Sequence, residues 1–259
     1  MGDRKYKYIY GPIFSWRLGR SLGIDPISSD EKVCSFDCTY CQIGRTGVLT
    51  DERRVFVAAD DIVSELESLP GVEIDYMTFS GRGEPTLAAN LGEMIRAARR
   101  ARADKVAVIT NSSLMGRRDV RDDLKLADFV LAKLDAASQG VFERINRPAK
   151  GITFEGVVEG IRRFRGEYRG RLALQLMFLE ENLAEAERMA EIARSIGPDE
   201  VEINTPLREC AVGPLPEYEI DGIASHFEGM KVVTVYGGKR GSVQRMSDED
   251  TLLRRGKRT

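Results

Sequence analysis

The feature that most constrains the fold of this chain is a regular alternation of strand-like and helix-like segments. Short apolar runs rich in β-branched residues alternate about six times with longer amphipathic segments. Strands that alternate with helices form a parallel sheet, because each helix returns the chain to the starting edge of the next strand. The pattern therefore predicts an α/β fold in which helices cover the sheet.

The predicted strands cover residues 21–27, 75–79, 105–109, 129–134, 172–179, 201–203 and 231–236. The predicted helices cover residues 59–69, 87–102, 119–125, 154–164, 183–196 and 220–227. Gly11 and Pro12 predict a turn before the first strand. No stretch rich in glycine, proline or serine interrupts this order, so no linker between domains is predicted.

A second feature is a group of three cysteines near the start of the chain. Cys34, Cys38 and Cys41 have the spacing C-x3-C-x2-C, and Cys210 is the fourth cysteine of the sequence. Thiolates are soft ligands that favour zinc, copper(I) or iron–sulfur clusters. Three thiolates leave one iron of a four-iron cluster without a protein ligand, so a small molecule can bind there.

Other interpretations of these cysteines stay open at this point. Their spacing also fits one face of a helix, which would make them core residues. The polar Ser35 and Asp37 and the nearby Gly44 favour a loop instead. A disulfide would leave an odd thiol, and zinc would need a fourth ligand although the only histidine, His226, is distant in sequence.

The cysteine segment resembles the cluster motif of the radical SAM superfamily. A second stretch, Ser-Gly-Arg-Gly-Glu-Pro-Thr-Leu at residues 80–87, resembles its G-G-E motif. In more detail, the chain resembles the branch of iron–sulfur oxidoreductases related to wybutosine synthesis. The segments that carry this closer resemblance are Tyr10-Gly-Pro, Arg17-Leu-Gly-Arg-Ser-Leu-Gly, Lys133-Leu-Asp-Ala, Ile145-Asn-Arg-Pro148 and Asn204-Thr-Pro.

The resemblance implies a partial (β/α)6 TIM-like barrel with a short C-terminal extension. Residues 1–259 would form a single radical SAM domain, with a core at about 18–210 and the extension at about 211–259. It also implies an enzyme whose [4Fe-4S] cluster is held by the three clustered cysteines and binds S-adenosylmethionine (SAM). Such an enzyme cleaves SAM to a 5′-deoxyadenosyl radical that acts on a substrate, here unidentified, and takes electrons from a donor such as ferredoxin or flavodoxin.

Polar residues gather where the predicted strands end, which is where parallel α/β sheets place their working residues. Glu84 matches the superfamily position that holds the methionine amino group of SAM, and Gly81 and Gly83 allow close approach of the backbone. The alternative is an ordinary turn closed by Pro85. Asn111 could bind the ribose or carboxylate of SAM, or cap the helix that follows.

Further candidates for cofactor binding follow the later strands. Lys133 and Asp135 lie two positions apart and face the same way, so they could contact SAM, or only form an ion pair. Gln175 could point into the barrel, and Asn204 ends the last barrel strand. Tyr40, just before the last clustered cysteine, completes this set of candidates.

Cys210 lies on a loop after the strand that ends at Asn204. A lone free cysteine is most often a small buried hydrophobic residue. The neighbours Pro206 and Arg208 are not the apolar residues that usually surround a core thiol. We therefore expect Cys210 to line the substrate cavity and treat it as a candidate catalytic residue.

Composition limits the partners and the compartment. The net charge of −2 gives no basic field for nucleic-acid binding. The basic segment 253–259 is expected to be a solvated end, with contact to a phosphate backbone as the alternative. The start of the chain lacks a signal-peptide pattern, and no apolar run could span a bilayer. We expect a cytoplasmic, reducing location and no membrane partner.

Three alternative functions remain beside the main prediction. The first is a radical SAM enzyme that modifies a tRNA or RNA base. The flavodoxin-like domain and the further cysteine cluster of wyosine-forming enzymes have no counterpart in this sequence, which argues against tRNA as the substrate. The second is an activating enzyme for a glycyl-radical protein. The third is a non-catalytic module that binds zinc or a cluster.

Overall fold

The computed structural model describes residues 6–256, and one eight-stranded sheet organises them. In spatial order its strands are β1 (Ile9–Ser15), β2 (Gly19–Ile24), β5 (Tyr76–Phe79), β6 (Lys105–Thr110), β7 (Phe129–Lys133), β8 (Arg171–Met177), β9 (Glu200–Asn204) and β10 (Val232–Thr234). The β1–β2 pair is antiparallel, and every later pair is parallel. The short strands β3 (Val33–Cys34) and β4 (Val48–Leu49) pair separately.

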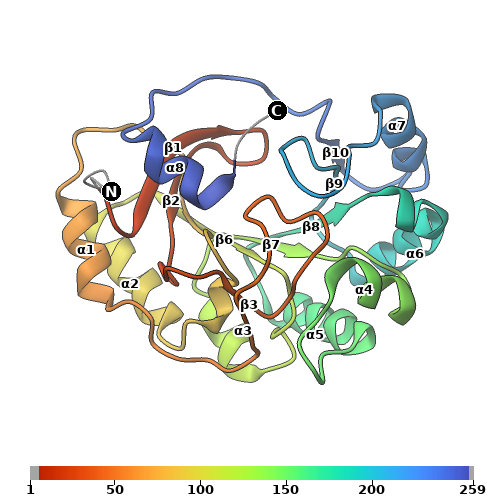
Figure 1. Cartoon of the computed structure of the whole chain (residues 1–259), viewed down its shortest axis with the longest axis horizontal. Helices are drawn as coiled ribbons and strands as arrows, with labels where there is room; N and C mark the ends of the chain where they lie inside the picture. Colours follow the sequence, from red (N-terminus) through yellow and green to blue (C-terminus); the bar gives the residue numbers. More distant parts are fainter. Residues whose placement is uncertain (1–5, 257–259) are drawn as a thin grey trace.

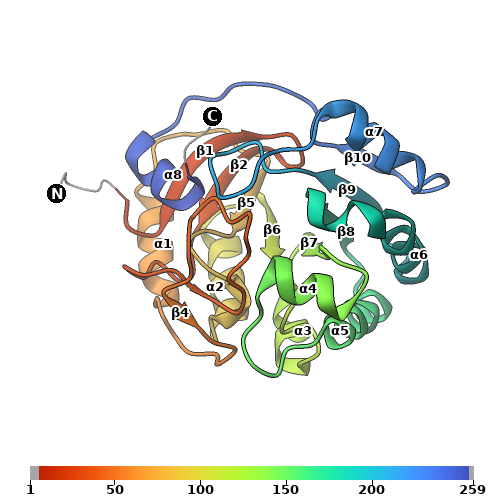
Figure 2. The same cartoon turned by 45° about the vertical axis from the view of Figure 1, so that its right-hand side comes forward.

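The connections between the parallel strands are helical. The helices are α1 (Ala59–Glu67), α2 (Leu91–Ala101), α3 (Arg118–Leu124), α4 (Gln139–Asn146), α5 (Phe154–Glu167), α6 (Ala186–Ile196), α7 (Glu217–Ser225) and α8 (Asp248–Arg255), with 3-10 turns at Pro85–Leu87 and Glu180–Glu185. Figures 1 and 2 show a curled sheet with α1, α2, α3, α5 and α6 around its outer side. This arrangement confirms the predicted partial (β/α)6 barrel. No helix within residues 6–256 has both the length and the apolar character needed to cross a membrane.

The inner face of the sheet changes from apolar to polar along the strands. A small core of buried side chains lies against its first half and includes Leu18, Phe129 and Ala173. Toward the carboxyl ends the inward positions are polar, as at Gln175 on β8 and Glu202 on β9, both fully buried. Strands covered on both faces are usually continuous apolar runs, so these polar positions mark the end of the barrel that carries a site.

The prediction of a turn at Gly11 and Pro12 was wrong, because both residues lie inside β1. β1 is an edge strand, where proline interrupts no ladder to a second neighbour. The register with β2 is irregular between Tyr10 and Ile13, which accommodates the two residues. The helix α4 was not predicted either, since it is short.

The C-terminal segment is not a solvated end as far as the structure describes it. Helix α8 packs against β1, as Figure 1 shows, and residues 257–259 lie outside the described part. Arg254 of α8 is 3% exposed, and its Nε lies 3.3 Å from Oδ2 of the fully buried Asp25. This ion pair joins α8 to the residue that follows β2, and it supports our proposal that the chain forms one domain.

Replacement of Arg254 by methionine is expected to lower the free energy of unfolding by about 3 kcal/mol, because it leaves the Asp25 carboxylate buried without its partner. Denaturant unfolding measures the change. The matched control is Arg245→Met, which breaks an exposed pair with Asp248 (2.8 Å) and is expected to cost less than about 1 kcal/mol. Equal losses in the two variants would contradict a stabilising role for the buried pair.

Candidate active site

The three clustered cysteines lie in β3 and in the loop that follows it, and the end of α4 holds this loop in place. The backbone N–H of Asp37 donates to the carbonyl oxygen of Asn146 (3.0 Å), and that of Thr39 donates to Ile145 (2.9 Å). The last carbonyls of a helix have no partners within the helix. The loop therefore supplies those partners, and α4 fixes the loop at the carboxyl ends of the strands.

Each of the three thiols accepts a hydrogen bond from a nitrogen of a polar side chain. The pairs are Lys32 Nζ with Cys41 Sγ (3.1 Å), Asn146 Nδ2 with Cys38 Sγ (3.5 Å) and Asn111 Nδ2 with Cys34 Sγ (3.6 Å). A neutral thiol is a weak acceptor. Donors to sulfur stabilise the thiolate form and tune a bound metal, so this donor set suits metal-bound thiolates.

Lys32 is the charged member of the donor set. It is 6% exposed, and its ammonium group also donates to the carbonyl oxygen of Gly44 (2.9 Å). Burial lowers the pKa of Lys32, but the thiols of Cys41 and Cys34 raise it by more, so that the net direction is upward. A buried cation at this position favours negative charge on the sulfur atoms.

The cysteines themselves are costly to ionise without a metal. Burial, with the charges of Glu84 and Cys38, raises the pKa of Cys34 to about 12. Metal binding must therefore supply the free energy of deprotonation. Within residues 6–256 no three histidine, cysteine, aspartate or glutamate side chains converge closely enough to hold one metal ion. Thiolates that each bind a different iron of a cluster need no such convergence, so the loop fits a cluster.

The Gly81–Glu84 loop lies directly against β3. Gly81 has a φ of +140°, and a Cβ there would lie 2.4 Å from the Cγ of Asp25. A Cβ on Gly83 would lie 2.0 Å from the carbonyl oxygen of Val33, which also accepts the Glu84 N–H at 3.2 Å. Glycine is required at Gly83 because a side chain would push the loop away from the cysteine strand, and at Gly81 because a side chain would collide with Asp25 and the backbone has a positive φ.

The Glu84 carboxylate is buried and fully engaged by the protein. Oε1 accepts hydrogen bonds from Thr86 N (3.1 Å), Thr86 Oγ1 (2.7 Å) and Thr110 Oγ1 (2.6 Å), while Oε2 accepts from Asn111 N (2.7 Å). Burial raises the pKa of Glu84, and these donors oppose the shift. A direct contact with the SAM amino group, as the resemblance implies, would compete with four protein donors. Glu84 instead fixes Asn111, which donates to Cys34.

Tyr40, Lys133 and Asp135 come together beside the loop. The Tyr40 hydroxyl donates to Asp135, and the Lys133 ammonium lies 4.4 Å from the Tyr40 ring centroid and 3.8 Å from Asp135 Oδ2. Asn146 donates to the same Asp135 oxygen at 2.9 Å. Burial raises the pKa of Tyr40 well above its usual value, so it remains a neutral donor. This network connects β7 to the cysteine loop.

Gln175 and Asn204 occupy neighbouring strands. Gln175 pairs in register with Lys133 on one side and Glu202 on the other, and its amide nitrogen lies 3.4 Å from Glu202 Oε2. Asn204 pairs in register with Met177, and its side-chain oxygen accepts from Thr205 N (3.0 Å). Gln175 therefore belongs to the polar row inside the barrel, and Asn204 lies one layer nearer the carboxyl edge.

A cavity of about 820 Å³ opens between the cysteine loop and the loop after β9. Its walls include Cys38 and Cys41 from the first loop and Cys210 from the second. The Cys210 thiol is half-buried and donates to the carbonyl oxygen of Val212 (3.1 Å). Cys210 thus lines the same cavity as two of the clustered thiols.

The sequence reasoning missed several residues of this site. Lys32 stands two positions before Cys34, and alternation in an extended segment was a signal that both could face one side. Asn146 lies 108 residues from the thiol that it contacts and carries no local signal. In the sequence, Glu202 could be recognised only as a charged residue between the apolar residues of the predicted strand 201–203.

The partial barrel, with a three-thiol loop at the carboxyl ends of its strands, defines the class of protein. Residues 32–193 match the family model described as the radical SAM superfamily. The chain belongs to this superfamily and is a radical SAM enzyme. Membership implies an iron–sulfur cluster and SAM as its cofactors.

Within that class, the chain is one of the UPF0026 proteins. It is 40% identical over 220 residues to a UPF0026 protein of Synechocystis sp. PCC 6803, covering 84% of this chain and 81% of the relative. It is 40% identical over 209 residues to a UPF0026 protein of Methanocaldococcus jannaschii, covering 77% of this chain and 63% of the relative.

A solved structure has the same fold at much lower identity. The structure of TYW1 with a lysine–pyruvate adduct bound superimposes with a TM-score of 0.64, over 83% of this chain and 76% of that chain. The two sequences are 15% identical, so the likeness concerns the fold alone.

Proposed function

We propose that this enzyme holds a [4Fe-4S] cluster through Cys34, Cys38 and Cys41 and cleaves SAM reductively to a 5′-deoxyadenosyl radical, which acts on a substrate in the adjoining cavity. The observation that carries the proposal is the donor set, in which each clustered thiol accepts a hydrogen bond from a different polar side chain. When bound, such a cluster would provide the electron needed to reduce the sulfonium of SAM. The chain's own residues hold the cluster, orient SAM and enclose the substrate.

The residues proposed to face SAM surround the cysteine loop. Gly83 brings the loop backbone against β3 and Gly81 brings it against Asp25, so that the backbone can accept or donate hydrogen bonds at close range. Glu84 is a positioning residue for Asn111. Asn111, Lys133 and the other polar residues at the strand ends offer groups to the ribose and carboxylate of SAM. The further members of this set are Tyr40, Asp135, Gln175 and Asn204.

The remaining parts of the proposal concern partners and place. An electron donor such as ferredoxin or flavodoxin supplies the electron, and the protein works in the cytoplasm, where reducing conditions protect thiolates. Cys210 acts on the substrate from the far wall of the cavity.

Anaerobic reconstitution with iron and sulfide tests the proposal. We expect about four irons and four sulfides per chain, the number in one such cluster, with broad absorption in the blue region. Addition of a reductant and SAM is expected to release 5′-deoxyadenosine, measured by chromatography. Stoichiometric zinc in the purified protein, together with no SAM cleavage after reconstitution, would instead favour a zinc-binding module.

Replacement of Lys32 by methionine is expected to make the reduction potential of the cluster more negative by about 60 mV, the one-electron equivalent of a tenfold change. The reason is that the variant loses a buried positive charge and a hydrogen bond to Cys41, both of which favour the reduced state. A potentiometric titration followed by electron paramagnetic resonance measures the shift. Lys105→Met, at an exposed position of β6, is the control and should leave the potential unchanged. A wild-type potential in Lys32→Met would contradict this role.

A further inference from the structure

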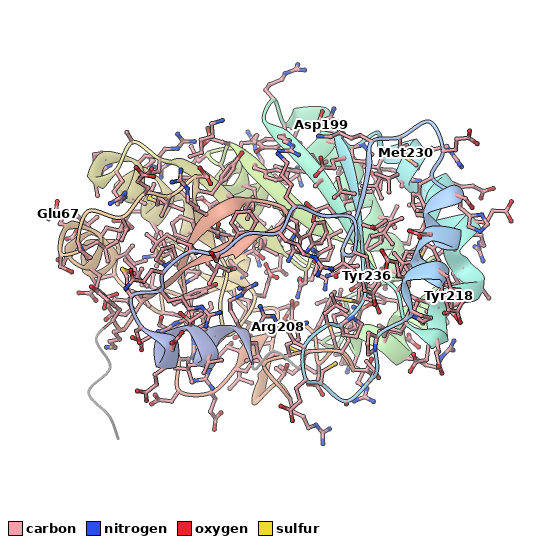
Figure 3. The ribbon with its side chains drawn as sticks, turned by 90° about the horizontal axis from the view of Figure 1, so that it is seen from above. Glu67, Asp199, Arg208, Tyr218, Met230 and Tyr236 are labelled. Atoms are coloured by element: carbon pink, nitrogen blue, oxygen red, sulfur yellow. The ribbon has the colours of Figure 1, made fainter. Side chains whose placement is uncertain are left out.

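The last helix, α8, lies against β1 and ends beside the cysteine loop (Figures 1 and 2). A Cβ on Gly256, which follows the helix, would lie 2.2 Å from the carbonyl oxygen of Gln42 in the cysteine loop. Arg208, from the loop after β9, donates to the carbonyl oxygen of Gly256 (3.3 Å), and Figure 3 shows Arg208 near the middle of the molecule. The C-terminal end of α8 is therefore enclosed by loops that border the cavity.

Arg254, in the last turn of α8, is held firmly by its surroundings. Its Nη1 donates to the carbonyl oxygen of Asp250 (3.2 Å), and its Nη2 donates to that of Lys7. Its Nε lies 3.3 Å from Oδ2 of Asp25, and the side chains of Arg254 and Asp25 are each 1% exposed. Two nitrogen atoms of the guanidinium are thus bound by backbone oxygens, which leaves the Nε edge facing Asp25.

The Asp25 carboxylate also contacts the Gly81–Glu84 loop. Oδ2, the oxygen that faces Arg254, accepts a hydrogen bond from the backbone N–H of Arg82 (3.2 Å). Oδ1 accepts from the N–H groups of Ile27 (3.1 Å) and Ser28 (3.0 Å). The carboxylate fills the space that a side chain on Gly81 would occupy. Asp25 therefore connects α8 to the backbone of this loop through a single oxygen atom.

The Arg254 charge favours the form of Asp25 that binds the loop. Burial raises the pKa of Asp25, while the backbone N–H of Ser28 and the charge of Arg254 oppose that rise. Within residues 6–256, Arg254 is the only cationic side chain in an ion pair with Asp25. A charged carboxylate accepts stronger hydrogen bonds from backbone N–H groups than a neutral carboxyl does. Loss of the Arg254 charge is therefore expected to weaken the hold of Asp25 on Arg82.

We propose that Arg254 is a positioning residue for SAM, which acts through Asp25 on the backbone of the loop at Gly81 and Arg82. A buried carboxylate that loses its cation is costly, so it takes up a proton or moves toward water. Either change releases the loop that is proposed to face SAM. The inference rests on the proposed function, because it gives the C-terminal helix a part in binding that cofactor. Asp25 and Arg254 both lie outside residues 32–193, which match the family model.

SAM binding to the anaerobically reconstituted full-length protein gives the first test. We expect Arg254→Met to retain the iron content of the wild type and to bind SAM about tenfold more weakly, a usual size for coupling between distant groups. Arg254→Lys, which keeps the charge, should recover part of the affinity. Circular dichroism establishes that each variant is folded before its affinity is compared.

A matched control separates positioning from a general loss of stability. Arg171→Met removes an arginine whose Nη2 lies 2.6 Å from Oε2 of the buried Glu200, at the start of β8 and so at the opposite end of the barrel from the cysteine loop. This variant also loses an ion pair to a buried carboxylate. Its affinity for SAM should equal that of the wild type.

A double-variant cycle tests whether Arg254 acts through Asp25. Asp25→Asn has nearly the same shape as the wild-type residue and removes the charge that Arg254 balances. If the two residues form one path to the loop, the combined variant Asp25→Asn with Arg254→Met should bind SAM no more weakly than Asp25→Asn alone. Because the combined variant has no unpaired charge, it also provides a folded protein if Arg254→Met is too unstable to study.

Hydrogen–deuterium exchange tests the same contact without the cofactors. In the protein before reconstitution, we expect Arg254→Met to lose protection in peptides that cover residues 24–29 and 80–84, because these contain the N–H groups bound to Asp25. Arg171→Met should keep wild-type protection in both peptides. The measurement uses mass spectrometry of the digested full-length protein.

Several results would overturn the inference. These are wild-type affinity for SAM in folded Arg254→Met, an equal loss of affinity in Arg171→Met, additive losses in the double-variant cycle, or unchanged protection at residues 80–84. Failure of the proposed function has a different signature, namely a wild-type protein that assembles no cluster or does not cleave SAM. In that case, a loss of protection confined to Arg254→Met still supports the path from α8 to the loop, and its absence overturns it.

Discussion

Replacement of Cys34, Cys38 or Cys41 by alanine, one at a time, is expected to reduce the iron retained after anaerobic reconstitution to the background level of unreconstituted protein. Three thiolates are the smallest set that leaves one iron open for SAM, so the loss of any one leaves two irons unprotected. Each variant also leaves a nitrogen donor without its sulfur acceptor. In Cys38→Ala, for example, the side chain of Asn146 loses the Cys38 sulfur atom to which it donates. Iron and sulfide analysis, with the visible absorption, measures the effect.

Cys210→Ala is the matched control for these variants. It removes the same chemical group from a residue that lines the same cavity, and it should retain full iron and the release of 5′-deoxyadenosine in the absence of substrate. If Cys210 acts on the substrate, this variant loses only the turnover of the true substrate. Full iron in any of the three cluster variants, or loss of iron in Cys210→Ala, would contradict the assignment of the ligands.

Replacement of Glu84 by alanine is expected to lower the free energy of unfolding by at least about 3 kcal/mol, because four hydrogen-bond donors lose their acceptor in a buried site. The affinity of the reconstituted protein for SAM is expected to fall roughly tenfold or more, equivalent to about 1.4 kcal/mol. The reason is that Asn111 loses its backbone anchor and the loop from Gly81 loses its attachment. Denaturant unfolding and equilibrium binding of SAM measure the two effects.

Two comparison variants make this prediction specific. Glu84→Gln keeps one acceptor oxygen and should lie between wild type and alanine in both measurements. Glu93→Ala, at an exposed position of α2, should change stability by less than about 0.5 kcal/mol. An unchanged affinity for SAM in a folded Glu84→Ala protein would mean that Asn111 and its loop do not take part in SAM binding.

Most of the barrel could be predicted because its strands carry a local signal. The segments at Lys105–Thr110 and Phe129–Lys133 are short, apolar and followed by amphipathic helices, and the structure has them as β6 and β7. Elements at the edge of the sheet and at the ends of the chain were harder to predict from the sequence. β1 contains Gly11 and Pro12, which are turn formers by local preference, and only pairing with β2 makes them part of a strand.

The cysteine spacing together with the motif at residues 80–87 indicated the superfamily from the sequence, because both motifs are short and local. The alternation of strands and helices likewise determined the barrel, because both are local periodicities. Only the tertiary structure decided which groups surround the thiols. Asn111 and Asn146 reach Cys34 and Cys38 from 77 and 108 residues away. Such contacts depend on how distant elements pack, and no short-range pattern encodes them.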